Sequence, residues 1–197
     1  MTQQTRRVVG NITLSLDGRI TGRGGDYDMG WIVPHAVTDI ARDHMTLMTG
    51  GATTVLLGRK NYEGFGSYWP SVANDDNAEP RDRAFAQWLD TVEKVVFSTT
   101  LTDAPWQNSR VSRDPISEVD ELRTRPGGDI IVLSSSSIIR ALLAANELDR
   151  LIINLCPEIV CGGARLFDDT LPQSAWSLAD QSTSTTGATL LTYDHQR

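Results

Sequence analysis

Short runs of β-branched and apolar residues alternate with amphipathic segments along most of this chain, and this alternation constrains its fold more than any other feature. Runs of this length and composition predict buried strands. The runs are residues 8–14, 53–57, 95–97, 130–133 and 151–155, followed by two strand-like segments, 176–184 and 189–194, around Gly187. Repeated strand–helix–strand units that end in a hairpin predict an α/β fold with a mixed, mostly parallel sheet, flanking helices and an antiparallel C-terminal hairpin.

Apolar residues at three- and four-residue spacing predict helices between these runs. Pro34 and Pro80 suit first-turn positions, and Gly50-Gly51 suits a helix end. The predicted helical segments are residues 33–48, one turn after residue 58, and segments around 80–89, 116–122 and 138–143. No linker is long enough to divide the chain, so we expect one domain, residues 1–197.

Charge and composition exclude several classes of function. The 197 residues carry a formal net charge of −7, which argues against nucleic-acid and membrane partners, because both need a basic surface. The polar N-terminus does not match a signal peptide, and no apolar stretch has the length of a membrane span. Two cysteines, Cys156 and Cys161, and three scattered histidines fit no metal or disulfide pattern. We therefore expect a cytoplasmic enzyme or binding protein without a metal.

The junction after the second run carries the first candidate ligand site. Open α/β sheets bind ligands beyond the carboxyl ends of their strands. Gly58 permits close backbone approach, and Arg59 and Lys60 supply positive charge where a helix start offers free N–H groups. With Asn61 they fit a phosphate or pyrophosphate. A solvated basic turn is the alternative.

Hydroxyl groups mark two further junctions. Ser98 and Thr99 follow a predicted strand and could hydrogen-bond a ribose or its phosphate, although both are ordinary turn residues. Residues 134–137 are four serines between a strand and a helix, where hydroxyl and N–H groups favour an anion. Helix capping is the alternative for one of them. Neither a Rossmann fingerprint nor a P-loop occurs at these junctions.

One acidic and several aromatic residues are candidates for substrate contact. Asp17-Gly18 ends the first strand and would place a carboxylate at the same rim, or else form an ordinary turn. Trp31 and Trp69, with neighbouring aromatic residues, could stack on a flat ring, although aromatic side chains more often belong to the core.

Taken in chain order, five segments resemble the dihydrofolate reductase-like superfamily, and most closely the reductase (C-terminal) domain family of the bifunctional riboflavin-biosynthesis deaminase–reductase. The segments are ITLSLDGRI (12–20), VLLGRKNYE (55–63), KVVFSTTL (94–101), residues 130–143 and residues 147–167. They span nearly the whole chain, and no deaminase domain precedes them, so the chain resembles a stand-alone version.

This resemblance implies a dihydrofolate reductase-like sheet, an NADPH site across the three junctions, and a homodimer. It places Gly58, Arg59, Lys60 and Asn61 at the pyrophosphate and adenosine phosphate. It also brings Ser98 and Thr99 toward the 2′-phosphate. The diphosphate would lie against Ser135, Ser136, Ser137 and Ile138. Asp17 would face the nicotinamide and the substrate.

Two features depart from this family pattern. Relatives carry glycines where residues 134–137 are serines, and each added Cβ narrows the approach of a cofactor and disfavours positive φ. Dihydrofolate reductases place a carboxylate two residues after the proline of Trp-x-x-Pro. Here Trp31-Ile32-Val33-Pro34 is followed at that position by Ala36, with Asp39 one helical turn on, which argues against dihydrofolate as substrate.

The expected function is an NADPH-dependent reductase of the 5-amino-6-(5-phosphoribosylamino)uracil reductase type. It would pass a hydride to a small pyrimidine- or pterin-like substrate. In this hypothesis Asp17 anchors the substrate or delivers a proton. The alternative is a non-catalytic ligand-binding or stress-related protein whose serine-filled loop has closed the cofactor site.

Overall fold

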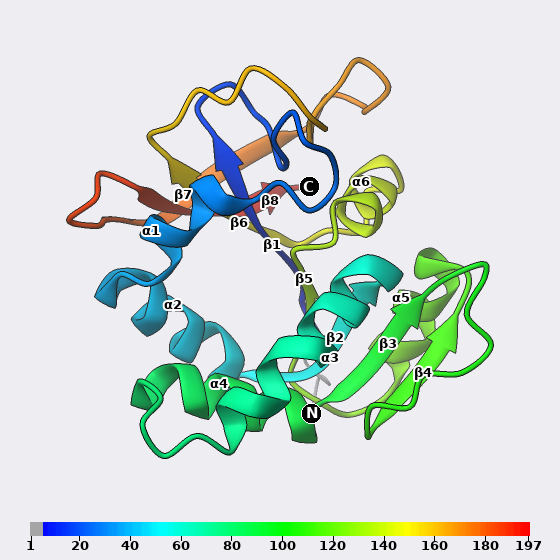
Figure 1. The fold of residues 1–197 in the computed structure, drawn as a ribbon. Helices are drawn as coiled ribbons and strands as arrows, with labels where there is room; N and C mark the ends of the chain where they lie inside the picture. The colour runs from blue at the N-terminus through cyan, green and yellow to red at the C-terminus, as the bar shows by residue number, and fades with distance from the viewer. Residues whose placement is uncertain (1–5) are drawn as a thin grey trace.

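A computed structural model describes residues 6–197, and it confirms the mixed, mostly parallel sheet (Figure 1). Its strands follow the order β4-β3-β2-β5-β1-β6-β8-β7. They are β1 (Val8–Ser15), β2 (Ala52–Gly58), β3 (Glu93–Phe97), β4 (Ser109–Ser112), β5 (Asp129–Leu133), β6 (Arg150–Cys156), β7 (Ala175–Thr183) and β8 (Thr189–Gln196). Neighbours from β4 to β6 are parallel, whereas β8 pairs antiparallel with both β6 and β7. The predicted C-terminal hairpin is thus confirmed.

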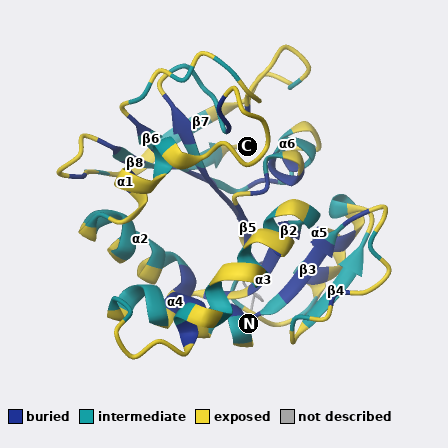
Figure 2. Cartoon of the chain, viewed as in Figure 1, coloured by how far each residue is buried: buried dark blue, intermediate teal, exposed yellow. Residues whose placement is uncertain are grey.

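Helices cover both faces of the parallel part of the sheet, and Figure 2 shows its strands as the buried centre. They are η1 (Gly30–Ile32), α1 (Val33–Ala36), α2 (Asp39–Gly50), α3 (Arg59–Ala73), α4 (Pro80–Thr91), α5 (Pro115–Thr124) and α6 (Ser136–Ala144). One core layer lies between the sheet and α2, α3 and α4, and the other lies under α5 and α6. Within residues 6–197, no helix has the length and apolar character needed to cross a membrane.

Three predicted segments differ from the structure. The helix expected over residues 33–48 is broken, because Thr38 adopts an extended conformation and caps α2 by accepting a hydrogen bond from the Ala41 N–H at 3.3 Å. The single turn expected after residue 58 is the fifteen-residue α3, which continues through Pro70. Strand β4 was not predicted, since its sequence SRVS is short and polar.

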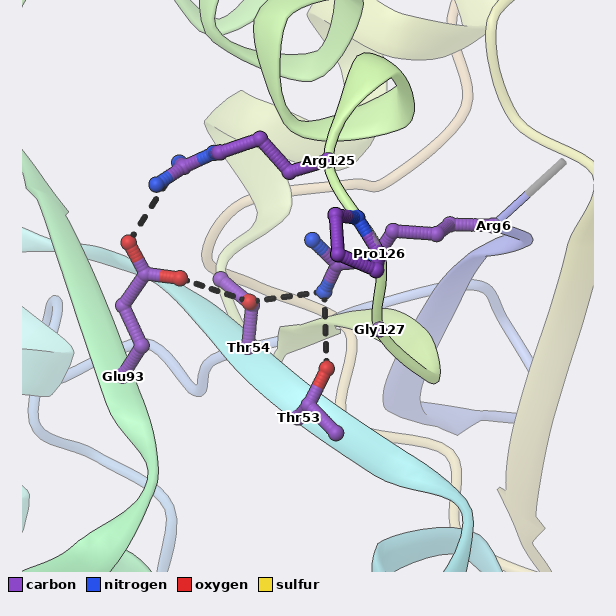
Figure 3. Close-up of a pocket in the computed structure, with 7 residues that line it drawn as sticks. All are labelled: Arg6, Thr53, Thr54, Glu93, Arg125, Pro126 and Gly127. Atoms are coloured by element: carbon purple, nitrogen blue, oxygen red, sulfur yellow. Dashed lines mark hydrogen bonds and ion pairs between the residues drawn. The ribbon is translucent and has the colours of Figure 1, made fainter.

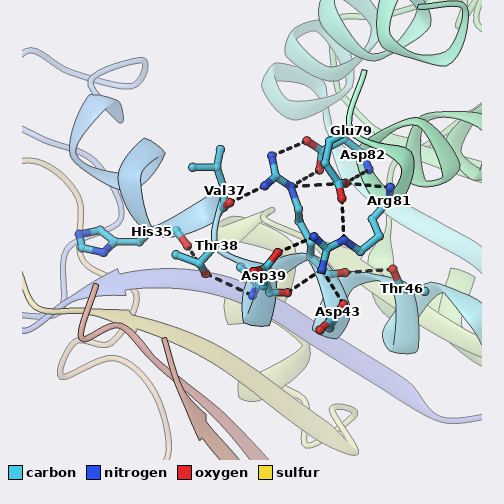
Figure 4. A network of polar contacts seen from close by, with 11 residues as sticks. His35, Val37, Thr38, Asp39, Asp43, Thr46, Glu79, Arg81 and Asp82 are labelled. Atoms are coloured by element: carbon cyan, nitrogen blue, oxygen red, sulfur yellow. Dashed lines mark hydrogen bonds and ion pairs between the residues drawn. The ribbon is translucent and has the colours of Figure 1, made fainter. Parts of the chain in front are cut away.

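Ion pairs join α2 to α4 (Figure 4). Arg81 of α4 contacts Asp39 at 2.5 Å and Asp43 at 2.8 Å, and Arg42 of α2 contacts Asp82 at 2.8 Å. Exposed ion pairs contribute only about 0–1 kcal/mol each, so the network orients the helices more than it stabilises them. The Asp39 carboxylate, the nearest substitute for the acid missing at Ala36, is therefore engaged in helix packing.

Lys94 of β3 is a fully buried cation. Its Nζ donates to the carbonyls of Leu89 at 2.6 Å and Val92 at 3.0 Å, which caps the end of α4, and it lies 4.8 Å from the Trp106 ring centroid. Burial lowers the pKa of Lys94 to about 8, although the charge of Asp90 opposes this effect. At neutral pH the cost of burying the charged ammonium therefore lowers the free energy of unfolding, and the hydrogen bonds to these two carbonyls offset part of that cost.

The depressed pKa predicts a pH-dependent stability. Between pH 8 and 10.5 the folded chain has released the Lys94 proton while the unfolded chain still holds it, so the free energy of unfolding rises with pH. Urea unfolding at about pH 7.5 and about pH 9.5 should show Lys94 adding about 1–2 kcal/mol at the higher pH. The Lys94→Met variant should lack this increment. An equal pH dependence in both proteins would contradict the prediction.

Candidate functional site

The structure brings the three predicted junctions together at one edge of the sheet. β2 lies between β3 and β5 and is parallel to both, so the carboxyl ends of these strands point the same way. Gly58 is in register with Phe97, and Leu56 is in register with Val132. Residues 58–61, 98–99 and 134–138 therefore leave the sheet side by side.

The Ser135 hydroxyl ties two of these junctions to each other. It accepts hydrogen bonds from the Gly58 N–H at 2.9 Å and from Asn61 Nδ2 at 3.0 Å, and it donates to the Leu133 carbonyl at 3.0 Å. Asn61 Nδ2 also donates to the Ser134 carbonyl at 2.5 Å. Ser135 is only 3% exposed, so the predicted cofactor contacts of Ser135 and Asn61 compete with bonds inside the protein.

The other residues of the serine loop differ in whether their side chains and N–H groups are available to a ligand. Ser134 adopts a left-handed φ of 52°, a conformation that a glycine adopts without strain. Ser134 and Ser137 are exposed and Ser136 is half-buried, whereas the Ile138 side chain is buried in the core. The Ile138 N–H donates to the Ser135 carbonyl at 3.1 Å. The first turn of α6 thus leaves the N–H groups of Ser136 and Ser137 as the available donors.

Both basic residues at the start of α3 are paired with acids. Arg59 contacts Glu63, one turn along the helix, at 3.1 Å, and Lys60 contacts Asp26 of the loop after β1. All four side chains are 40–60% exposed, so these pairs contribute little stability and a phosphate could displace the acids. The two cations therefore remain available to an anion.

The β3 junction contains a cation that sequence analysis missed. Ser98 is buried, and its hydroxyl accepts from the N–H groups of Thr100 at 3.1 Å and Leu101 at 2.9 Å, so it shapes the turn. Thr99 is exposed, and its carbonyl accepts from Arg113 Nη1 at 3.2 Å. Arg113 follows β4, which is parallel to β3, and this proximity could not be predicted because β4 itself was not.

These features fit the phosphates of a dinucleotide. A Cβ built on Gly58 would lie 3.7 Å from Ser135 Oγ and 3.9 Å from Ser137 Oγ, at ordinary van der Waals distance, so the serine loop lies directly beside this residue. Two helices begin at the edge, and their first N–H groups carry partial positive charge. The side chains of Arg59, Lys60 and Arg113 add three cations at this edge of the sheet.

Asp17 joins the loops that follow β1 and β6. Its carboxylate accepts from the Ser15 hydroxyl at 2.7 Å and from the N–H groups of Val160 and Cys161, both at 3.0 Å. These hydrogen bonds, led by that of Ser15, lower the pKa of Asp17 far below its usual range. The carboxylate is thus ionised at neutral pH, and its expected proton delivery stays a prediction, as does its expected substrate anchoring.

The two candidate tryptophans differ in their surroundings. Trp69 packs edge-on against Phe85 with ring centroids 4.7 Å apart, and it lies ten residues into α3, about 15 Å from the candidate edge. The expected substrate contact of Trp69 is therefore not supported, because the ring belongs to the core. Trp31 lies in η1 after the β1 loop, and its buried Nε1 has no hydrogen-bond partner among the described residues.

Solved structures share this fold over nearly the whole chain. A Shewanella sp. PV-4 protein assigned to riboflavin biosynthesis is similar with a TM-score of 0.72 and 17% identity, covering 97% of this chain and 99% of that one. An Enterococcus faecalis dihydrofolate reductase complexed with NADP(H) has a TM-score of 0.63 and 14% identity, with 97% of each chain covered. The fold is therefore dihydrofolate reductase-like, as the resemblance implied.

A two-activity enzyme gives the third match. The Thermotoga maritima diaminohydroxyphosphoribosylaminopyrimidine deaminase/5-amino-6-(5-phosphoribosylamino)uracil reductase has a TM-score of 0.66 and 16% identity; the match covers 99% of this chain and 58% of that one. The sequence model of the RibD C-terminal domain family matches residues 6–192. This chain therefore belongs to the RibD C-terminal domain family.

Proposed function

We propose that this protein is an NADPH-dependent reductase that transfers a hydride to a small pyrimidine- or pterin-like substrate, in the manner of 5-amino-6-(5-phosphoribosylamino)uracil reductases. The observation that carries the proposal is the single sheet edge where two helix starts and three cations meet. The family membership and the NADP(H) complex of the similar dihydrofolate reductase support it. The expected homodimer and cytoplasmic location stay predictions.

The chain's own residues would bind and orient the cofactor. Arg59 and Lys60 would exchange their acidic partners for phosphate oxygens, and the N–H groups at the start of α6 would face the diphosphate. Arg113 and Thr99 would approach the 2′-phosphate. The Ser135 hydroxyl would keep the β2 and β5 junctions at a fixed separation by its bonds to Gly58 and Asn61.

The substrate would lie beyond β1, near Asp17 and Trp31. NADPH, when bound, supplies the hydride from its nicotinamide. Asp17 would hold the two adjoining loops in place as an ionised group, and the unpartnered Trp31 N–H would offer a donor to a substrate carbonyl or ring nitrogen. The protein would contribute to such a hydride transfer by holding the nicotinamide and substrate rings in position and by excluding water.

Isothermal titration with NADPH tests the proposal directly. We expect a dissociation constant in the micromolar range or tighter, because charge-assisted phosphate contacts gather at this edge. The left-handed Ser134 and the buried Ser135 favour the alternative, a ligand-binding protein with a closed cofactor site. Absence of measurable heat with NADPH would support that alternative.

The Arg59→Ala variant should lose about tenfold or more in affinity for NADPH, and less in affinity for NADH, because it removes one charge-assisted contact to the adenosine 2′-phosphate, which NADH lacks. Arg113→Ala should likewise lose more affinity for NADPH than for NADH. The matched variant Glu63→Gln frees Arg59 from its acidic partner and should bind NADPH slightly more tightly. Equal losses for both cofactors in Arg59→Ala would contradict a role at the 2′-phosphate.

The role assigned to Asp17 predicts a stability effect in acid. Asp17→Asn should lower the urea midpoint at pH 7, because an amide cannot accept from both the Val160 and Cys161 N–H groups as the carboxylate does. The pKa is depressed in the folded chain, so the contribution is present above the unfolded value of 3.8 and is lost as the pH falls below it. The midpoints of the variant and the wild type should therefore converge in acid. A constant gap would rule out this role.

A further inference from the structure

Arg6 is a buried cation whose hydrogen-bond acceptors among residues 6–197 are all neutral. It is 6% exposed and precedes β1 at the edge of the sheet opposite the candidate cofactor site. Its guanidinium donates to the hydroxyls of Thr53 at 2.9 Å and Thr54 at 2.8 Å, and to the carbonyls of Gly128 at 2.8 Å and Leu122 at 3.2 Å. Buried charges are normally paired, because removing an ion from water costs several kcal/mol.

A cavity of about 220 Å³ lies beside this guanidinium (Figure 3). Its charged lining is Arg6, Arg125 and Glu93, so two cations face one carboxylate. The Arg125 Nε is buried and has no hydrogen-bond partner within residues 6–197, although its Nη2 lies 3.4 Å from Glu93. The charged lining of the cavity thus carries a net positive charge.

The Glu93 carboxylate already contacts three other side chains. Its Oε2 accepts from the Thr54 hydroxyl at 2.9 Å, and its Oε1 is shared between Arg110 and Arg125, each at 3.4 Å. Burial lowers the pKa of Arg6, the charges of Glu93 and Asp129 oppose this effect, and the like charge of Arg125 adds to it. One carboxylate therefore does not neutralise the cations that surround it.

In the wall of the cavity, the backbone at Gly127 lies close to the Arg6 guanidinium. A Cβ on Gly127 would lie 2.8 Å from Thr53 Oγ1 and 2.9 Å from Arg6 Cζ, so only glycine lets this loop lie over the guanidinium. The volume is below the roughly 300–1,000 Å³ of sites for drug-sized ligands, which suits a small ion rather than a nucleotide.

We propose that this cavity is a second anion site, which binds a phosphate-sized oxyanion between Arg6 and Arg125. Guanidinium groups match such oxygens in geometry and charge, and the anion would supply the counter-charge that Arg6 lacks. The ion would be either inorganic phosphate or the phosphate of a small monoester. The site is independent of the proposed reductase activity, since it lies at the amino ends of β2, β3 and β5.

Titration calorimetry with inorganic phosphate and with glycerol 3-phosphate, at constant ionic strength against chloride, tests the proposal. Arg125→Gln should weaken phosphate binding about tenfold or more, the loss expected for one charge-assisted partner. The control Arg83→Gln removes an arginine of α4 that pairs with exposed Asp76, and it should leave the affinity unchanged. Tighter binding of the ester would identify a phosphomonoester as the ligand, and equal or weaker binding would identify the free ion.

Phosphate could also bind at the cofactor edge, and a further variant separates the two sites. Arg59→Ala should retain phosphate binding to the cavity even though it weakens NADPH. Phosphate binding that is absent from the wild type, unchanged in Arg125→Gln, or lost in Arg59→Ala would overturn the proposal. If circular dichroism shows that Arg125→Gln does not fold, Arg125→Lys replaces it. This variant keeps the charge but lacks the planar guanidinium that binds two oxygens at once, so it should still weaken phosphate binding several-fold.

Discussion

Parallel pairing of β3, β2 and β5 is the constraint on which the candidate site depends. Parallel strands send their carboxyl ends to one edge, and the register holds Gly58 level with Phe97. The pairing is maintained by strands that are buried on both faces, with Leu56, Val96 and Ile131 fully inaccessible. Three loops that are distant in sequence consequently begin within one strand spacing of their neighbours, at about 4.8 Å per strand.

Residues at this edge are held by contacts that a ligand can either use or replace. The Ser135 hydroxyl bridges two junctions from a buried position, so it fixes geometry more than it offers binding. Arg59 and Lys60, by contrast, are paired only with exposed acids. Because exposed ion pairs are weak, the same cations can exchange a carboxylate for a phosphate at little cost.

The sequence predicted most strands and the order of the junctions, because buried runs and strand ends are local signals. It did not predict α3 at full length, since Gly64, Gly66 and Pro70 are poor helix formers and packing against the sheet compensates for them. Strand β4 was not predicted because its four residues are short and polar, and the placement of Arg113 was missed with it. The core position of Trp69 and the loop-joining bonds of Asp17 depend on tertiary contacts that no local pattern records.

We propose that dinucleotide phosphates bind where these three junctions meet. Titrating isotopically labelled protein with NADPH, and following backbone amides by two-dimensional NMR, tests it most directly. The largest shifts should fall on residues 58–61, 98–99 and 136–137. Saturable binding that leaves the chemical shifts of those amides unchanged, and shifts amides in another part of the chain, would contradict a cofactor site at these junctions.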